Sequence, residues 1–149
     1  MSMLQRGKQL TDILVRDIMI SSEKVAHVQM NNPLEHALLV LVKSGYSAVP
    51  VLDSSSKLVG TIGKTVILNE ILGLERFEVE KLSEMTVQDV MKRNIPLLTE
   101  NHSFTEALKE VINTPFVCVV DDEGYFDGIL TRRAILKELR KYIYSTFDH

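Results

Sequence analysis

The side chains best suited to chemistry in this chain are the basic ones that open its last predicted helix. Thr131, Arg132 and Arg133 follow one another there, and the segment 131–143 carries a net charge of +4. A hydroxyl and two guanidinium groups at a helix N-terminus can bind a phosphate, because charged hydrogen bonds and backbone N–H groups converge on the anion. The same residues are also typical of the solvated face of an amphipathic helix. These residues alone are therefore compatible with two interpretations, an anion-binding site and a solvated helix face.

The residue types that carry most catalysis form no recognisable constellation. The four histidines lack metal-ligand spacing, and one cysteine cannot form a zinc pair. The sequence holds no Gly-x-Ser-x-Gly elbow, no Walker loop and no Gly-x-Gly-x-x-Gly turn. We therefore expect a protein that is not an enzyme, with no catalytic residue, no metal and no cofactor.

Composition indicates a small globular protein of 149 residues, either one domain or two half-size units. Its 17 Lys and Arg stand against 20 Asp and Glu, and the net charge of −3 argues against a nucleic-acid partner. No apolar run reaches the roughly 18–20 residues of a membrane span, so we expect no membrane partner. The single cysteine, Cys118, cannot form an internal disulfide and favours a reducing, cytoplasmic location.

Four motifs occur twice in the same order and indicate a tandem duplication. The pairs are Asp17-Ile18-Met19 with Asp89-Val90-Met91, Ala37-Leu38 with Ala107-Leu108, Val51-Leu52-Asp53 with Val119-Val120-Asp121, and Gly60-Thr61-Ile62 with Gly128-Ile129-Leu130. The number of residues between matching motifs of the two copies becomes smaller at two points along the chain. The second copy is therefore shorter by two residues in each of two loops.

The duplication predicts a first unit over 12–72, a linker over 73–85 and a second unit over 86–143, each ordered helix, strand, helix, strand, strand, helix. Units of this size bury too little surface alone, so we expect them to pack sheet against sheet.

Capping signals predict where the helices begin and end. Asn32 would cap the main helix of the first unit, with Glu35 closing a capping box and Gly45 ending the helix. Ser103 to Glu106 form the matching box in the second unit, and Thr86 caps the short helix before it. The predicted strands cover residues 46–52, 58–62, 116–120 and 126–130.

At this level of detail the repeat resembles a known family. A unit with Asp-x-Met at its head, Ala-Leu in its helix, an apolar strand ending in Asp and a Gly-led strand before its last helix resembles a cystathionine-β-synthase (CBS) domain. Two in tandem resemble a CBS pair, or Bateman module, over about residues 12–143. The resemblance implies an α/β (α+β) fold whose two CBS units pack by pseudo-twofold symmetry and dimerise into a CBS module.

Longer stretches are similar to the stand-alone bacterial CBS pairs that sense cyclic di-AMP, the DarB/CbpB type. These stretches are residues 24–29, 35–41, 116–119, 131–133 and 136–139. The similarity implies a homodimeric, non-enzymatic receptor that binds cyclic di-AMP. It also implies that the nucleotide-free protein engages target enzymes, including a Rel-type (p)ppGpp synthetase/hydrolase and pyruvate carboxylase, and that the nucleotide displaces it.

The family pattern implies two clefts between the units. The first would take its ligand-binding residues from both repeats: Lys24, Val25, Ala26, His27, Tyr46, Ser47, Ala48, Val49, Pro50, Thr131, Arg132 and Arg133. Its cations and hydroxyl would hold phosphate, and its small and aromatic residues would form walls for purines. The second cleft would combine 94–98, 116–120 and Gly63-Lys64-Thr65. Because it has a glycine in place of the hydroxyl and one lysine in place of two arginines, we expect one ligand per subunit.

One departure from the family bears on the ligand. CBS pairs that bind AMP or ATP usually carry an Asp three residues after the Thr or Ser, to hold the ribose hydroxyls, whereas Val66 and Ala134 stand at those positions. A cyclic dinucleotide has its 3′-oxygens tied up in phosphate, so the loss of this carboxylate costs it little and removes a repulsion. The departure favours cyclic di-AMP. An AMP or ATP sensor of the same fold and an interaction module without a ligand remain the alternatives, and Lys24 as a plain surface residue and Tyr46 as a core residue also stay open.

Overall fold

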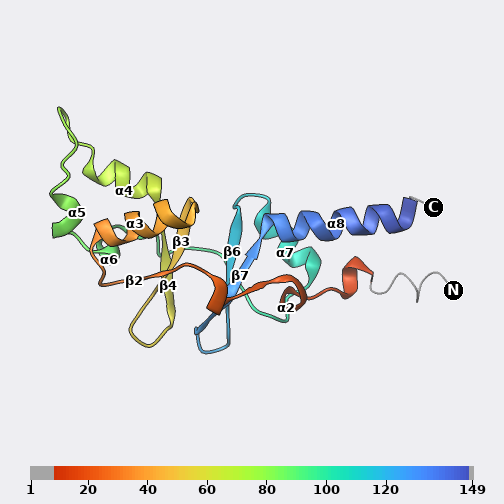
Figure 1. Ribbon diagram of the computed structural model, residues 1–149. Coiled ribbons are helices and arrows are strands. Elements are labelled where there is room, and N and C mark those ends of the chain that lie inside the picture. The colour runs from red at the N-terminus through yellow and green to blue at the C-terminus, as the bar shows by residue number, and fades with distance from the viewer. Residues whose placement is uncertain (1–8, 148–149) are drawn as a thin grey trace. The chain divides into compact units, whose positions relative to one another are not determined.

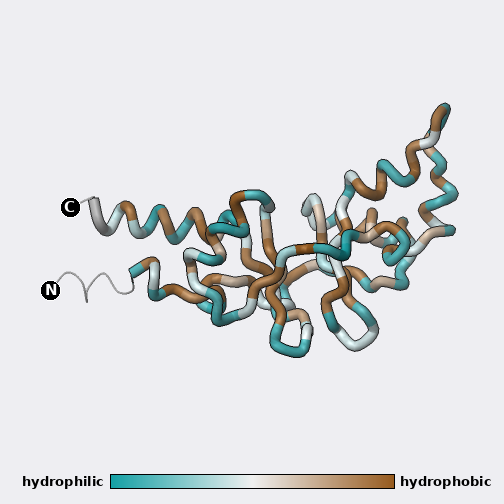
Figure 2. The backbone as a smooth tube through the Cα atoms, turned by 180° about the vertical axis from the view of Figure 1, so that it is seen from behind, coloured by the Kyte–Doolittle hydropathy of each residue, from teal (hydrophilic) through white to brown (hydrophobic). Residues whose placement is uncertain are grey.

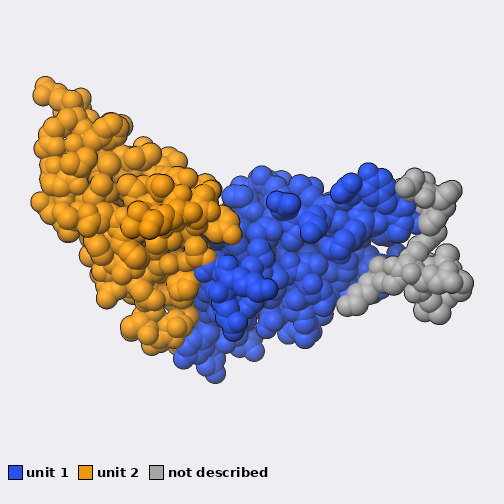
Figure 3. All heavy atoms as spheres, in the orientation of Figure 1, with its two compact units in different colours: residues 1–25, 96–149 blue, residues 26–95 orange. Residues whose placement is uncertain are grey.

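The computed structural model describes residues 9–147 and divides the chain into two compact units (Figures 1 and 3). We call residues 1–25 and 96–149 the terminal unit, because it contains both chain ends, and residues 26–95 the middle unit. This division differs from the sequence repeat, since the segment before Ala26 joins the core of the second repeat.

The terminal unit contains a four-stranded sheet in the order β1-β7-β6-β5, with β5 and β6 parallel and the other pairs antiparallel. Its elements are η1 (Leu10–Asp12), α2 (Val15–Ile18), β1 (Ile20–Ser21), η2 (Ser22–Lys24), β5 (Leu97–Leu98), α7 (Phe104–Val111), β6 (Phe116–Val120), β7 (Phe126–Thr131) and α8 (Arg132–Phe147).

The middle unit contains a three-stranded sheet in the order β2-β3-β4, with β2 and β3 parallel and β3 and β4 antiparallel. Its elements are β2 (Val28–Gln29), α3 (Leu34–Ser44), β3 (Ala48–Leu52), β4 (Leu58–Gly63), α4 (Lys64–Ile71), α5 (Lys81–Glu84) and α6 (Val87–Val90). Residues 73–85, the predicted linker, therefore include a short helix, α5.

Each unit combines the core of one repeat with the head segment of the other. In the terminal unit, the Val15 N–H donates to the His102 carbonyl at 2.9 Å. In the middle unit, the Val87 N–H donates to the Asn32 carbonyl at 2.8 Å. Because residues 15 and 87 are repeat equivalents, as are 102 and 32, the two repeats exchange their head segments in the same way.

Two repeat-equivalent glycines allow these head segments to cross the sheets. A Cβ on Gly60 would collide with the Lys92 carbonyl oxygen, and a Cβ on Gly128 would collide with that of Ile20. Both collisions are with backbone, which cannot swing aside as a side chain can. Glycine is required at both positions by this close approach.

Each unit has its own hydrophobic core between the sheet and its helices. In the middle unit Leu34, Ala37 and Leu41 of α3 are fully buried, and Leu38 beside them is partly buried. In the terminal unit Phe104, Ala107 and Val111 of α7 are likewise buried, and Leu108 is partly buried. Figure 2 shows the strands as largely hydrophobic, while the turn between β6 and β7 is hydrophilic.

Local signals predict most, but not all, of the element boundaries. Ser103 and Glu106 form the predicted capping box, and Gly45 ends α3 in the left-handed conformation. The capping box expected from Asn32 and Glu35 is wrong: the Asn32 amide oxygen accepts from the Gln29 N–H at 2.8 Å, and Pro33 precedes the helix. The strand expected from Tyr46 begins at Ala48, because the helix cap extends into the two residues before it.

Candidate functional site

The predicted phosphate-binding residues lie where β7 runs into α8. Thr131 is the residue before α8, and its hydroxyl oxygen accepts from the Ala134 N–H at 3.0 Å. The Arg132 N–H donates to the Pro115 carbonyl at 2.8 Å. Among the described residues, no partner is recorded for the Arg133 N–H. The 16-residue helix α8 therefore begins with one available N–H group, and its dipole favours an anion there.

The two adjacent arginines have different surroundings. The Arg132 Nε donates to the Val111 carbonyl at 2.8 Å, and one of its terminal nitrogens lies 3.4 Å from the Ile112 carbonyl. These carbonyls end α7, where a cation is favourable. Arg133 is exposed, and no hydrogen bond or ion pair is recorded for its guanidinium within residues 9–147. Arg132 thus joins two helices of its unit, and Arg133 is the cation available at the start of α8.

Lys24 belongs to the same unit but lies along a different part of β7. The antiparallel register pairs Ser21 with Gly128, so η2 starts beside the first half of β7, whereas Thr131 is its last residue. Ser22 and Asp127 accordingly line one cavity of about 370 Å³. Lys24 is exposed and Val25 is buried at 5% exposure. The structure does not bring Lys24 beside the start of α8.

The remaining predicted residues lie in the middle unit around the start of β3. Since β2 and β3 are parallel and pair Val28 with Val51, Ala26 and His27 lie beside the first residues of β3. Ala26 and Ala48 are half-buried, while Ser47 is exposed. Tyr46 retains 41% exposure, so it is a surface residue and not part of the core. Ala26 and Ala48 thus place small, half-buried side chains near the start of β3.

Two of the predicted middle-unit residues are buried. Val49 is fully buried within the hydrophobic cluster of this unit, and Pro50, which follows it on the opposite face of β3, is also buried. Neither side chain is therefore exposed.

The position equivalent to Thr131 in the first repeat is built for a glycine. The Lys64 N–H donates to the Ser47 carbonyl at 3.0 Å, which repeats the bond from Arg132 to Pro115. A Cβ on Gly63 would stand 2.9 Å from that same Ser47 oxygen. The residue before α4 therefore has neither a hydroxyl nor room for one without a backbone shift.

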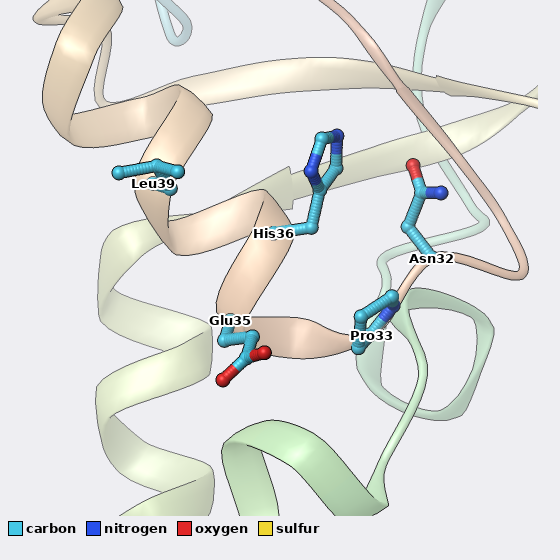
Figure 4. Close-up of a pocket in the computed structure, with 5 residues that line it drawn as sticks. All are labelled: Asn32, Pro33, Glu35, His36 and Leu39. Atoms are coloured by element: carbon cyan, nitrogen blue, oxygen red, sulfur yellow. The ribbon is translucent and has the colours of Figure 1, made fainter.

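One depression lies elsewhere, over the first turn of α3. It measures about 470 Å³ and is lined by Asn32, Pro33, Glu35, His36 and Leu39 (Figure 4). The Glu35 and His36 side chains point away from one another (Figure 4). The depression includes none of the twelve predicted ligand residues and gathers no set of converging polar groups.

Other chemistry-bearing groups in the described part of the chain are buried or isolated. Burial raises the pKa of the Cys118 thiol to about 12, so this side chain is a protonated core residue. Residues 9–147 contain no group of three or more His, Cys, Asp or Glu side chains arranged to hold a metal ion. Among the same residues, no helix is long and apolar enough to span a membrane.

Sequence reasoning missed the role of Arg132, which depends on carbonyls some twenty positions away. It also missed the exchange of head segments, because the repeated Asp-x-Met motif gives no sign of which core it joins. The Asp17 carboxylate accepts from the Leu14 N–H at 2.9 Å, and Asp89 does the same for Thr86. The motif is therefore a helix-capping device and not a ligand site.

The duplicated sheet-and-helix unit places this protein in a defined class. The CBS domain family matches residues 15–73 and 87–141, and the chain belongs to that family, with two CBS domains in tandem.

Within that family the chain is similar over most of its length to particular proteins. It is 54% identical to "Cyclic di-AMP receptor B" of Bacillus subtilis over 140 residues, which cover 94% of this chain and 95% of the receptor. A CBS-domain protein of Bacillus anthracis is 62% identical, with a TM-score of 0.84 over 89% of this chain and 96% of that structure. The CbpB protein of Listeria monocytogenes, solved in complex with c-di-AMP, is 48% identical, with a TM-score of 0.82 over 87% of this chain and 97% of that one.

Proposed function

We propose that this protein is a receptor for cyclic di-AMP that regulates partner enzymes and has no catalytic activity of its own. The observation that carries the proposal is the 54% identity, across nearly the full length of both chains, to the cyclic di-AMP receptor B of Bacillus subtilis. The likeness to a Listeria CbpB solved with the same nucleotide supports the same ligand. We also propose a cytoplasmic location, which suits a chain whose one cysteine is a free, buried thiol.

We propose that the ligand is held by the twelve residues of the predicted first cleft, which serve three purposes. Arg133, Thr131 and the α8 N-terminus would hold a phosphodiester, since one cation and one N–H group are available there. The edge formed by Ala26, His27 and the start of β3, with Tyr46 and Ser47 beside it, would hold a purine. Arg132 would act mainly by fixing the start of α8 against α7, and Lys24 would contribute charge from further along its unit.

The second cleft is proposed to stay empty. Gly63 leaves no hydroxyl at the position equivalent to Thr131, and a Cβ there would approach the Ser47 carbonyl oxygen at 2.9 Å. AMP and ATP are the competing ligands. The absence of a carboxylate at Val66 and Ala134 supports the cyclic dinucleotide over them, because no acidic group waits there for a ribose diol.

We further propose that the receptor is a homodimer whose targets include a Rel-type (p)ppGpp synthetase/hydrolase and pyruvate carboxylase. Two pairs of repeat-equivalent residues support self-association through the helices. Val42 and Ile112 are 62% and 67% exposed, and Leu68 and Leu136 are 45% and 56% exposed. Large apolar side chains repeated on the outer surface of both units are typical of a covered face.

Calorimetry of the purified protein with cyclic di-AMP, AMP and ATP tests the proposal. We expect cyclic di-AMP to bind most tightly, at one molecule per subunit. Tighter binding of AMP or ATP would replace the proposal with an adenine-nucleotide sensor. Two molecules per subunit would refute the empty second cleft, and no heat with any of the three would leave an interaction module without a ligand.

A further inference from the structure

An exposed apolar and acidic surface occupies one part of the middle unit. We call residues 70–84, from the end of α4 through α5, the acidic segment. It carries five glutamates against two cations, and Leu72, Leu74, Phe77 and Val79 are each more than half exposed. Leu74 is fully exposed, with a relative exposure of 106%. So dense an apolar surface is typical of a site that another molecule covers.

Both cations of the acidic segment are already neutralised inside it. Arg76 bonds Glu80 at 2.7 Å, and Lys81 lies 3.3 Å from Glu78. The carboxylates of Glu70, Glu75 and Glu84 have no recorded cation partner among residues 9–147. The surface therefore presents three uncompensated negative charges around its apolar residues, and a partner that covers it must be basic and apolar.

The outer face of α8 has that chemistry. Leu136, Ile143 and Tyr144 are each more than half exposed, and their spacing places them on one side of the helix. Lys141 is paired with Glu138 at 3.2 Å, and Arg132 is bound to the end of α7. Lys137 and Arg140 have no recorded acidic partner within the described residues, and Arg140 stacks on Tyr144.

We propose that the acidic segment of one copy of this protein docks on the outer face of α8 of a second copy. Three unpaired carboxylates and exposed apolar side chains on one surface match two unpaired cations, Lys137 and Arg140, and exposed apolar side chains on the other. In a twofold-symmetric dimer each contact is made twice, because each copy contributes both surfaces. This inference rests on the proposed homodimer and specifies which surfaces form it. Its alternative, α8 against α8, would bring two basic helices together and is disfavoured by repulsion.

Charge reversal on each surface tests the pairing. The variant Glu75→Lys, Glu84→Lys and the variant Lys137→Glu, Arg140→Glu should each weaken the dimer by at least about tenfold in sedimentation equilibrium, because like charges would then face each other. The chain that carries all four substitutions should regain dimerisation, since both surfaces have exchanged sign. The variant Lys57→Glu, Lys92→Glu is the matched control, with the same change in net charge as the α8 variant but at residues that belong to neither the acidic segment nor α8. Raising the salt to about 1 M, where the Debye length is about 3 Å, should weaken the wild-type dimer.

Each alternative predicts a different result. If Lys137→Gln, Arg140→Gln tightens the dimer, α8 faces α8 and the inference is wrong. If both charge-reversal variants dimerise as the control does, these surfaces are not the interface. A monomeric wild type would overturn both this inference and the proposed homodimer. Calorimetry of the same variants with cyclic di-AMP keeps the two proposals apart, because loss of dimerisation with nucleotide binding intact leaves the receptor assignment standing.

Discussion

Replacing the two adjacent arginines of α8 should have different consequences. Arg132→Met removes a charged hydrogen bond of 2.8 Å to the Val111 carbonyl and a longer contact of 3.4 Å to Ile112. A hydrogen bond to a charged group is worth about 1.5–3 kcal/mol, and partial exposure lowers the free energy lost to about 1–2 kcal/mol. In a chain of this size, that loss lowers the melting temperature by about 2–8 °C.

Arg133→Met breaks no hydrogen bond or ion pair of the guanidinium that is recorded within residues 9–147. The free energy of unfolding of this variant should therefore stay within about 0.5 kcal/mol of the wild-type value. If Arg133 holds a phosphate, its affinity for cyclic di-AMP should nevertheless fall at least about tenfold, or about 1.4 kcal/mol. The pair of variants therefore separates a residue that positions α8 from one that touches the ligand.

Urea unfolding and calorimetry on the wild type and both variants measure these two effects. Arg132→Lys is the matched control, because it keeps the charge near the end of α7 but loses the planar fork. Equal stability of Arg132→Met and the wild type would refute the role given to the contact with α7. Unchanged affinity in Arg133→Met would refute the phosphate site at the start of α8.

Three further predictions concern the cores, a helix cap and the partner. Gly60→Ala should cost at least about 1–3 kcal/mol of unfolding free energy in thermal melts, since its Cβ meets the Lys92 backbone. A Gly60→Ala variant as stable as the wild type would contradict this. The Ser103 backbone N–H, and next its hydroxyl, lower the pKa of Glu106, so this carboxylate stabilises the fold above its ordinary pKa of 4.5 and that stability is lost as the pH falls through the lowered value. The stability difference between wild type and Glu106→Gln should therefore shrink in acid, and a difference independent of pH would refute the cap's electrostatic part. In interferometry, the nucleotide-free protein should bind its target enzyme, and excess cyclic di-AMP should release it. The target should in turn weaken the affinity for the nucleotide by the same factor. If the wild type and Arg133→Met are released at the same nucleotide concentration, the proposed site is wrong.

Elements with local signals could be predicted from the sequence. The run Phe116–Val120 is apolar throughout and ends in a turn signal, and β6 has those same bounds. Ser103 and Glu106 form a cap because both groups lie within one helical turn. Asn32 carries an equally good local signal, but its side chain bonds Gln29 and its carbonyl accepts from Val87, far along the chain. A nonlocal partner thus decided between two uses of the same residue.

Partners far along the chain also limit how much of the site could be predicted from the sequence. Repeat positions placed Thr131 at the start of the last helix, whereas it is the last residue of β7 and α8 begins at Arg132. The spacing of the motifs does not reveal that the Thr131 hydroxyl oxygen accepts from the Ala134 N–H. It also does not distinguish Arg132 from Arg133, because the carbonyls that bind Arg132 end a helix some twenty positions earlier. Burial separates Val49 and Pro50 from their neighbours for a similar reason, since alternation along one strand does not specify what covers each face.

The exchange of head segments links these observations to a regulatory role. The segment that begins with Val15 completes the core of the unit holding Thr131 and Arg133, while the adjoining residues from Ala26 onward belong to the other unit. The proposed ligand contacts are therefore divided between two hydrophobic cores, and the chain passes between the two units after Val25 and again after Ile95. A ligand that uses both sets must select those arrangements of the two units in which both sets can reach it. It can shift a partner equilibrium only by the difference in its affinity for the free and partner-bound forms. A site shared between two cores provides such a difference, because a partner that holds the units in another arrangement weakens the ligand without touching any residue that binds it.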